Sequence, residues 1–380
     1  MQILYHSLSC SRKMGGTAFL KAALLSIISF FLIINQNCIN RSSKKSKDAP
    51  KDMEYVLKLK PGPDNPRNSE GDFITLKDGR IIFVYTHFLS KGDFGNAYLA
   101  SRYSTDNGKT WSNEDEIIVK QEGILNVMSV SLLRLQNEEI ALFYLRKNSE
   151  SDCIPMMRIS ADEAKTWNEP VQCITDKNGY FVLNNDRVIQ LKSGRILMPV
   201  AYHGEQYSQK SRTGKIFCYF SDDNGRSWLS SREVPNPDSV MTQEPGVVEL
   251  KNGEIFMFMR TDAGVQYMSV SEDMGETWRP SEKSNIISPR SPASVERIPS
   301  TGNLLLAWNN NGINQNRTPL NVAISKDEAK TWENIKTIEN DPDGIYCYMA
   351  IHFTDDHVLL SYTGHGEETI NRLSLDWIKN

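Results

Sequence analysis

The 380-residue sequence is poor in several residues and motifs on which whole classes of protein depend. It has six cysteines and six histidines, without a Cys-x-x-Cys pair or a histidine cluster, so no metal site is expected. Neither sign of charge predominates, since 43 basic residues face 47 acidic ones, and nucleic acid is therefore not an expected partner. Glycine-rich phosphate loops, the Gly-x-Ser-x-Gly elbow and the His-Glu-x-x-His helix are also missing, which argues against nucleotide-dependent, serine-hydrolase and zinc-protease chemistry.

Long apolar runs are missing too, with one exception near the beginning of the chain. Residues 22–34 carry no charge and follow three basic residues, a pattern typical of an export signal and short for a membrane span. We therefore expect an export signal over 1–38 and a periplasmic, cell-surface or secreted protein. Cys38 stands where a lipoprotein would be acylated, although the preceding Asn-Gln-Asn matches such sites poorly, and an uncleaved anchor helix is a further alternative. Residues 39–52 are rich in serine and basic residues, as in a solvated tether.

The remaining chain, 53–380, shows no helical period of apolar residues and is expected to be all-β. Four of the cysteines lie in this part, and an exported protein permits disulfides. Cys153 and Cys173 flank one repeat unit and could pair across neighbouring strands. The alternative is that these cysteines are buried free thiols.

A motif of the form Ser-x-Asp-x-Gly-x-Thr-Trp returns five times, at 104–111, 160–167, 221–228, 271–278 and 325–332. Its Ser and Asp side chains can accept hydrogen bonds from the amides of a tight turn, and its tryptophan can pack back on the sheet. Ala164 and Ala329 replace the glycine in two copies, so these turns are expected to be strained or differently wound. Five copies cannot share one active site, so the motif is structural. Trp308 then remains as the tryptophan to consider for stacking on a sugar.

A second pattern alternates with the first and consists of an apolar residue, a short turn and a run rich in β-branched and aromatic residues. Its copies begin at Leu76, Leu135, Leu191, Leu250, Ile298 and, more loosely, Phe353. Six such hairpins, each continued by a third and a fourth strand, predict a six-bladed β-propeller of four-stranded antiparallel blades. The repeated motif would form hairpin turns in blades 1–5. Blade 6 lacks it, and we expect its last strand at Thr369–Trp377, with Tyr55–Lys60 closing the ring.

The innermost strands of a propeller converge on its axis, so polar side chains that enter these strands share one mouth. Such residues precede the hairpins at Glu70, Ser129, 185–187, Glu244, 290–291 and 346–348. This gathering of charged and phenolic side chains predicts a polar site at one mouth of the ring.

These features resemble the sialidase (neuraminidase) family, whose Asp boxes have the form of the repeated motif. The resemblance covers nearly all of the chain after the leader. Thr242–Gly253 followed by Met259–Thr261 is similar to the family's paired Glu and Arg. Three further segments are similar to those of its last triad arginine, its tyrosine nucleophile and its first triad arginine: Arg317–Val322, Cys347–Ile351 and Pro66–Ser69, the last without the family's Phe-Arg-Ile-Pro.

The resemblance implies retaining hydrolysis of terminal sialic acids without a cofactor. It assigns Tyr348 as the nucleophile, Glu244 as its base and Asp93, 26 residues after Arg67, as the acid/base. The substrate carboxylate would be bound by three arginines, Arg67, Arg260 and Arg317, and Arg187 is a further candidate for holding substrate. A neutral tyrosine suits this chemistry, because the substrate's own carboxylate would repel a carboxylate nucleophile.

Each assignment has a simpler alternative. Glu244 and Arg260 could be an ordinary cross-strand ion pair, and Tyr348 could be a core tyrosine with Tyr346 facing the mouth. Arg317 could be a surface loop residue, Arg67 could be solvated, and Asp93 could simply hold a turn. The same fold could also act on another acidic sugar, such as a deaminated nonulosonate or a uronic acid, or it could bind sialic acid without turnover. We expect a monomeric protein whose partners are sialylated glycans or other acidic sugars.

Overall fold

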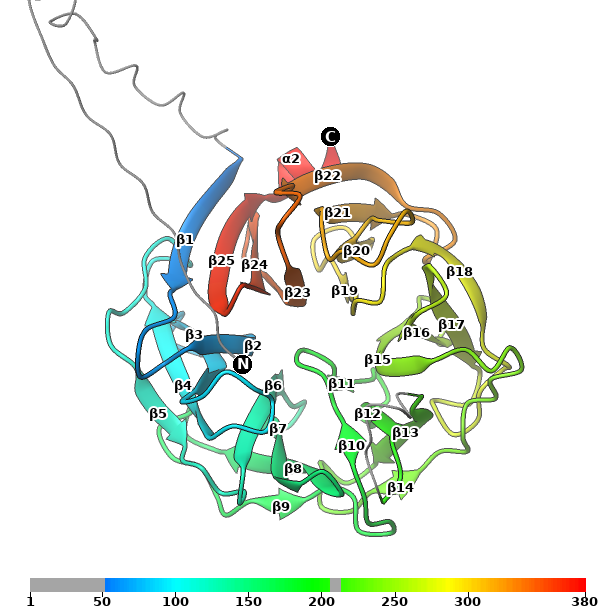
Figure 1. Cartoon of the computed structure of the whole chain (residues 1–380), viewed down its shortest axis with the longest axis horizontal. Coiled ribbons are helices and arrows are strands. Elements are labelled where there is room, and N and C mark those ends of the chain that lie inside the picture. Colours follow the sequence, from blue (N-terminus) through cyan, green and yellow to red (C-terminus); the bar gives the residue numbers. More distant parts are fainter. Residues whose placement is uncertain (1–51, 206–212) are drawn as a thin grey trace, which may run out of the picture. The chain divides into compact units, whose positions relative to one another are not determined.

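The structure is a computed structural model that describes residues 52–205 and 213–380. The expected export signal, Cys38 and nearly all of the basic tether lie outside the described residues. The described chain forms six antiparallel β-sheets, arranged as blades around a central axis (Figure 1). The prediction of an all-β, six-bladed propeller is confirmed.

The blades follow one another along the chain, and each runs from an innermost strand at the axis to an outermost strand at the rim. Blades 1 and 2 contain β2 (Arg67–Thr75), β3 (Ile81–Phe88), β4 (Ala97–Ser104), β5 (Glu116–Val119), β6 (Asn126–Arg134), β7 (Ile140–Ser149), β8 (Asp152–Ser160) and β9 (Val171–Gln172). Blades 3 and 4 contain β10 (Phe181–Val182), β11 (Ile189–Gln190), β12 (Ile196–Tyr202), β13 (Lys215–Ser221), β14 (Leu229–Ser230), β15 (Thr242–Glu249), β16 (Ile255–Thr261), β17 (Val265–Ser271) and β18 (Glu282–Ile287). Blades 5 and 6 contain β19 (Ser294–Arg297), β20 (Leu304–Asn309), β21 (Leu320–Ser325), β22 (Glu333–Glu339), β23 (Tyr346–Phe353), β24 (His357–Gly364), β25 (Glu367–Ser374) and β1 (Met53–Leu59). Blade 3 differs from the others because its innermost strand is split into β10 and β11, which both pair with β12.

Six clusters of buried apolar side chains join the blades, one between each pair of neighbours. Between blades 6 and 1, for example, Leu59 and Leu359 share a cluster with Phe73 and Phe83. Inner strands are buried on both faces because each blade packs against a neighbour on either side, so runs such as Ile255–Thr261 are buried throughout. Packing between blades therefore holds the ring together.

The five repeated motifs form the turns between the third and fourth strands of blades 1–5, as predicted. In the first copy the Ser104 hydroxyl accepts a hydrogen bond from the amide four residues on at 2.9 Å, and the Asp106 carboxylate accepts one from the Thr110 amide at 2.8 Å. The other four copies make the same two bonds. Ala164 and Ala329 keep the turn with φ of 61° and 67°, so these copies are strained, as predicted, but not differently wound. All five tryptophans pack against clusters between blades.

The ring closes in blade 6, where β1 pairs with β25 as its outermost strand. Closure by the Tyr55–Lys60 segment is thus confirmed. The strand expected over Thr369–Trp377 ends earlier, at Ser374, whose hydroxyl accepts a hydrogen bond from the Trp377 amide at 3.3 Å. This cap begins a short helix, α2 (Leu375–Lys379), where the sequence had predicted no helix.

The four cysteines of the described chain and Trp308 are buried in the core. Cys153 and Cys173 are buried free thiols, as are Cys218 and Cys347, so the alternative of a disulfide is wrong. Trp308 is buried between blades 4 and 5 and donates its indole N–H to the Ile287 carbonyl at 3.0 Å, so it cannot stack on a sugar. Within the described residues, no helix is long and apolar enough to cross a membrane.

Candidate active site

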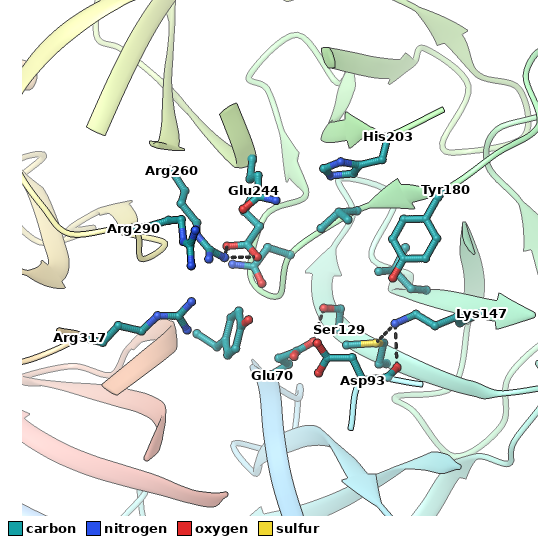
Figure 2. Close-up of a pocket in the computed structure, with 16 residues that line it drawn as sticks. Glu70, Asp93, Ser129, Lys147, Tyr180, His203, Glu244, Arg260, Arg290 and Arg317 are labelled. Atoms are coloured by element: carbon teal, nitrogen blue, oxygen red, sulfur yellow. Dashed lines mark hydrogen bonds and ion pairs between the residues drawn. The ribbon is translucent and has the colours of Figure 1, made fainter. Parts of the chain in front are cut away.

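A polar pocket of about 310 Å³ lies where the innermost strands meet (Figure 2). Blades 1 to 4 and 6, and the connections around blade 5, all supply side chains to its wall. Five of the expected site residues line it together: Asp93, Glu244, Arg260, Arg317 and Tyr348. The structure therefore brings side chains separated by up to 255 residues in the sequence into one cavity.

A repeated backbone irregularity aims several of these side chains. The innermost strands of blades 1, 2, 4 and 6 each contain a β-bulge, and each bulge has one residue in the left-handed region: Glu70 (φ 59°), Ser129 (62°), Glu244 (44°) and Tyr348 (59°). A bulge bends its strand and re-aims a side chain, and all four side chains line the pocket. Positive φ in a non-glycine residue costs free energy and is typical of functional sites.

Glu244 and Tyr348 lie close to two arginines. One terminal nitrogen of Arg260 lies 2.7 Å from each carboxylate oxygen of Glu244, and the guanidinium carbon of Arg317 lies 5.7 Å from the centre of the Tyr348 ring. Burial and the negative charge of Glu244 raise the pKa of Tyr348, while Arg317 opposes this effect. The phenol is therefore protonated at neutral pH.

Arg67 occupies a neighbouring position with two carboxylate partners. Its guanidinium donates to Glu70 at 2.7 Å, forms an ion pair with Asp93 and lies 4.2 Å from the ring centre of Phe88. Arg67 is not part of the pocket lining, although its two partners are. Burial would raise the pKa of Asp93, but the charge and hydrogen bond of Arg67 outweigh it and hold the pKa below its usual value. Asp93 is thus ionised while it is paired with Arg67.

The loop that carries Asp93 is anchored to blade 2 through its backbone. The carbonyl of Asp93 accepts hydrogen bonds from the Asn126 amide nitrogen at 2.9 Å and from the Lys147 ammonium at 2.8 Å. Asn126 also holds the Gly95 carbonyl at 2.7 Å. Asn126 and Lys147 are partners across β6 and β7, so one pair of strands fixes the loop.

Several lining residues were not assigned from the sequence. Lys147 and Tyr180 form the wall away from the arginines (Figure 2), and the apolar side chains of Met128, Leu145 and Val182 also line the pocket. Lys147 is buried on a strand that is otherwise mostly apolar, and a lysine in such a run is the signal that could have identified it. Arg290, which the sequence placed near the mouth without a role, lies beside Arg260 (Figure 2).

Arg187 does not line the pocket, and its expected role in holding substrate is wrong for this arrangement. It is buried, and its guanidinium donates to the Ser294 hydroxyl at 3.0 Å and to the Ala293 carbonyl at 2.6 Å. It belongs to the 183–188 segment between β10 and β11, which reaches toward the axis (Figure 1). In the same segment Asp186 accepts a hydrogen bond from the Ile351 amide at 3.0 Å. The segment thus ties blade 3 to blades 5 and 6 across the axis.

Comparison with known proteins agrees with this fold. A protein-family profile described as "BNR repeat-like domain" matches residues 99–360. A sialidase of Bacteroides fragilis (strain YCH46) is 25% identical over 211 residues, covering 53% of this chain and 37% of that protein. A Clostridium perfringens sialidase is 27% identical over 230 residues, covering 53% of this chain and 58% of that protein. The chain spans about half the length of the curated relatives it matches.

Solved structures of lower sequence identity also have a similar fold. The Hadza microbial sialidase Hz136 superposes with a TM-score of 0.69 and 18% identity over 82% of this chain and 66% of that one. A leech intramolecular trans-sialidase superposes with a TM-score of 0.69 and 15% identity over 86% of this chain and 70% of that one. At these identities the likeness shows the fold. The fold and its repeats define a BNR-repeat β-propeller, and the chain belongs to the sialidase family of such propellers.

Proposed function

We propose that this protein is an exo-α-sialidase, which removes terminal sialic acids from glycoconjugates with retention of configuration. The observation that carries the proposal is that Tyr348, Glu244 and Asp93 line one pocket together with arginines. This set contains a nucleophile, a base and an acid beside cations for a carboxylate. The sialidase relatives, which match about half of this chain, support the same reaction class.

The arginines account for recognition of an acidic sugar. Arg260 and Arg317 line the pocket, and Arg67 lies beside it on β2. Guanidinium groups form charge-assisted, partly bidentate bonds with carboxylates, so they would hold the carboxylate on the anomeric carbon of a sialoside. Their binding would place that carbon beside Tyr348.

In the first step, Glu244 takes the phenolic proton as the Tyr348 oxygen bonds to the anomeric carbon. The bond from that carbon to the leaving oxygen breaks, and the leaving oxygen takes the proton of Asp93. In the second step, Asp93 removes a proton from water as the water oxygen attacks the same carbon. The bond to Tyr348 then breaks, and Glu244 returns the proton to the phenol oxygen. Two displacements at one carbon retain its configuration.

We also propose that the protein acts outside the cytoplasm on sialylated glycans. The support is the leader over 1–38, with Cys38 as the candidate site of a lipid anchor. The basic tether over 39–52 would then separate the propeller from its point of attachment.

The test is hydrolysis of a fluorogenic α-sialoside by the purified protein, with Tyr348→Phe as the matched control. Phenylalanine keeps the ring and removes the nucleophilic oxygen, so we expect kcat to fall by at least about a thousandfold. Proton NMR of the first product formed should show the α-anomer. Equal rates in both proteins, or release of the β-anomer first, would overturn the proposed mechanism.

A further inference from the structure

The pocket has two ends of different chemistry. At one end lie the guanidinium groups of Arg260, Arg290 and Arg317, and at the other lie Lys147 and Tyr180 (Figure 2). Glu244 and Asp93 face the space between these ends. A substrate fixed by its carboxylate at the arginines therefore extends toward Lys147.

Lys147 is the cation at the far end of the pocket, and its side chain is almost wholly inaccessible, with the residue 2% exposed. Its ammonium donates to the Asp93 carbonyl at 2.8 Å and lies 3.2 Å from the sulfur of Met128. The rings of Phe94 and Tyr180 cover it, with centres 4.8 and 5.5 Å from the nitrogen.

An ammonium has three N–H donors, and a thioether is a weak acceptor. Within the described residues, the Asp93 carbonyl is thus the one strong acceptor that Lys147 reaches. Burying a cation with unsatisfied donors costs free energy, so a ligand oxygen at this end would be bound favourably.

The shape of a pyranose ring decides which part of the substrate reaches this end. With its carboxylate at the arginines and its anomeric carbon at Tyr348, the ring carbon opposite the anomeric carbon points toward Lys147. In nonulosonic acids this carbon carries either a hydroxyl or an acylated amine. The substituent on that carbon is therefore the part that Lys147 can distinguish.

We propose that Lys147 is a specificity residue that binds a hydroxyl group on this substituent, an inference that rests on the proposed function. The preferred substrates are then nonulosonates with a free hydroxyl there, or with an N-hydroxyacyl group, rather than those with an N-acetyl group. The far end of an N-acetyl group is a methyl, which accepts no hydrogen bond, so the ammonium would keep the Asp93 carbonyl as its strong acceptor. A hydroxyl oxygen at this end would accept a second hydrogen bond from the ammonium.

The test compares three umbelliferyl α-glycosides that differ only in this substituent: hydroxyl, N-glycolyl and N-acetyl. For the native protein we expect kcat/KM to favour at least one hydroxyl-bearing substrate over the N-acetyl substrate. In Lys147→Met, which keeps the length and removes the charge, this ratio should fall by about tenfold to a hundredfold, the worth of a hydrogen bond to a charged group. The two hydroxyl-bearing substrates show which length of substituent reaches Lys147.

Asn126→Ala is the matched control. Asn126 shares the Asp93 carbonyl with Lys147 but does not line the pocket, so its loss should loosen the Asp93 loop and lower kcat for all three substrates alike. A proportional loss on all three substrates in Lys147→Met as well would show that Lys147 only positions Asp93. A native preference for N-acetyl would also overturn the proposal.

Binding of the three free sugar acids, measured by calorimetry, separates this inference from the proposed function. Preferential binding of a hydroxyl-bearing acid without turnover would support the specificity role of Lys147 and refute the proposed sialidase activity. Turnover without that preference would support the activity and refute the role of Lys147. Should Lys147→Met fail to fold, Lys147→Arg keeps the charge and changes the reach. That variant should shift the preference between the two hydroxyl-bearing substrates, and an unchanged order would contradict the proposal.

Discussion

Ala164 and Ala329 occupy, at positive φ, the turn position that glycine holds in the other three Asp boxes. A Cβ in this region costs roughly 1–2 kcal/mol, while glycine costs about 0.5–1 kcal/mol more to order on folding. The two effects nearly cancel, which explains how alanine is tolerated. The Ser and Asp hydrogen bonds hold the turn in either case.

This balance predicts opposite results for two exchanges. Ala164→Gly should leave the free energy of unfolding unchanged or raise it by up to about 1 kcal/mol. Gly225→Ala should lower it by about 1–3 kcal/mol, because the new Cβ would lie 2.5 Å from the Met157 sulfur as well as at φ 84°. Urea unfolding of both variants measures the difference, and equal destabilisation would contradict the role given to φ.

The Asp93 loop, between β3 and β4, is the element on which acid catalysis would depend in the proposed reaction. Arg67 holds the pKa of Asp93 below its usual value, yet a general acid must be protonated. Substrate would cover this carboxylate, whose side chain is 57% exposed, and would bring a second carboxylate to the arginines. Both changes favour the protonated form and raise the pKa of Asp93.

The proposed role of Asp93 predicts different pH profiles for kcat/KM and for kcat. With Asp93 as the proposed acid, rates should fall as rising pH removes its proton, and kcat/KM reports the free enzyme whereas kcat reports the complex. The descending limb of kcat/KM should therefore lie at least about one pH unit below that of kcat. Profiles measured with a natural sialoside check this. Coincident limbs would mean that substrate does not change the environment of Asp93.

At this scale the sequence predicted most of the fold but less of the site. The Asp boxes and hairpins are local patterns, so the number of blades and the order of their strands could be derived from them. The 183–188 segment could not, because Arg187 looks like any polar residue entering an inner strand. Its burial depends on partners such as Ser294, more than a hundred residues away. The position of Lys147 in an apolar run is visible in the sequence, but its contact is not, because its partner is a carbonyl on another blade.

For the whole molecule, the seam between blades 6 and 1 matters most, because it joins the two ends of the described chain and adjoins the site. Blade 1 carries Arg67 and Asp93, and blade 6 carries Tyr348. The seam is held by a hydrogen bond from the backbone N–H of Asn68 to the Gly366 carbonyl at 2.8 Å and by the apolar cluster that contains Leu59. Loosening this seam would separate Tyr348 from Asp93 before the other blades unfold.

Two variants can test the coupling between this seam and the site. Leu59→Ala removes a side chain that is 7% exposed and should destabilise the protein by about 2–4 kcal/mol, whereas Ile117→Ala, on a strand edge and 51% exposed, should cost less than about 0.5 kcal/mol. On heating, sialoside hydrolysis by Leu59→Ala should disappear below the temperature at which circular dichroism records loss of the β-sheet, while in Ile117→Ala the two should disappear together. Loss of activity and of β-sheet at one temperature in both variants would contradict this prediction. It would mean that the ring unfolds as a unit and that loosening the seam does not disrupt the site first.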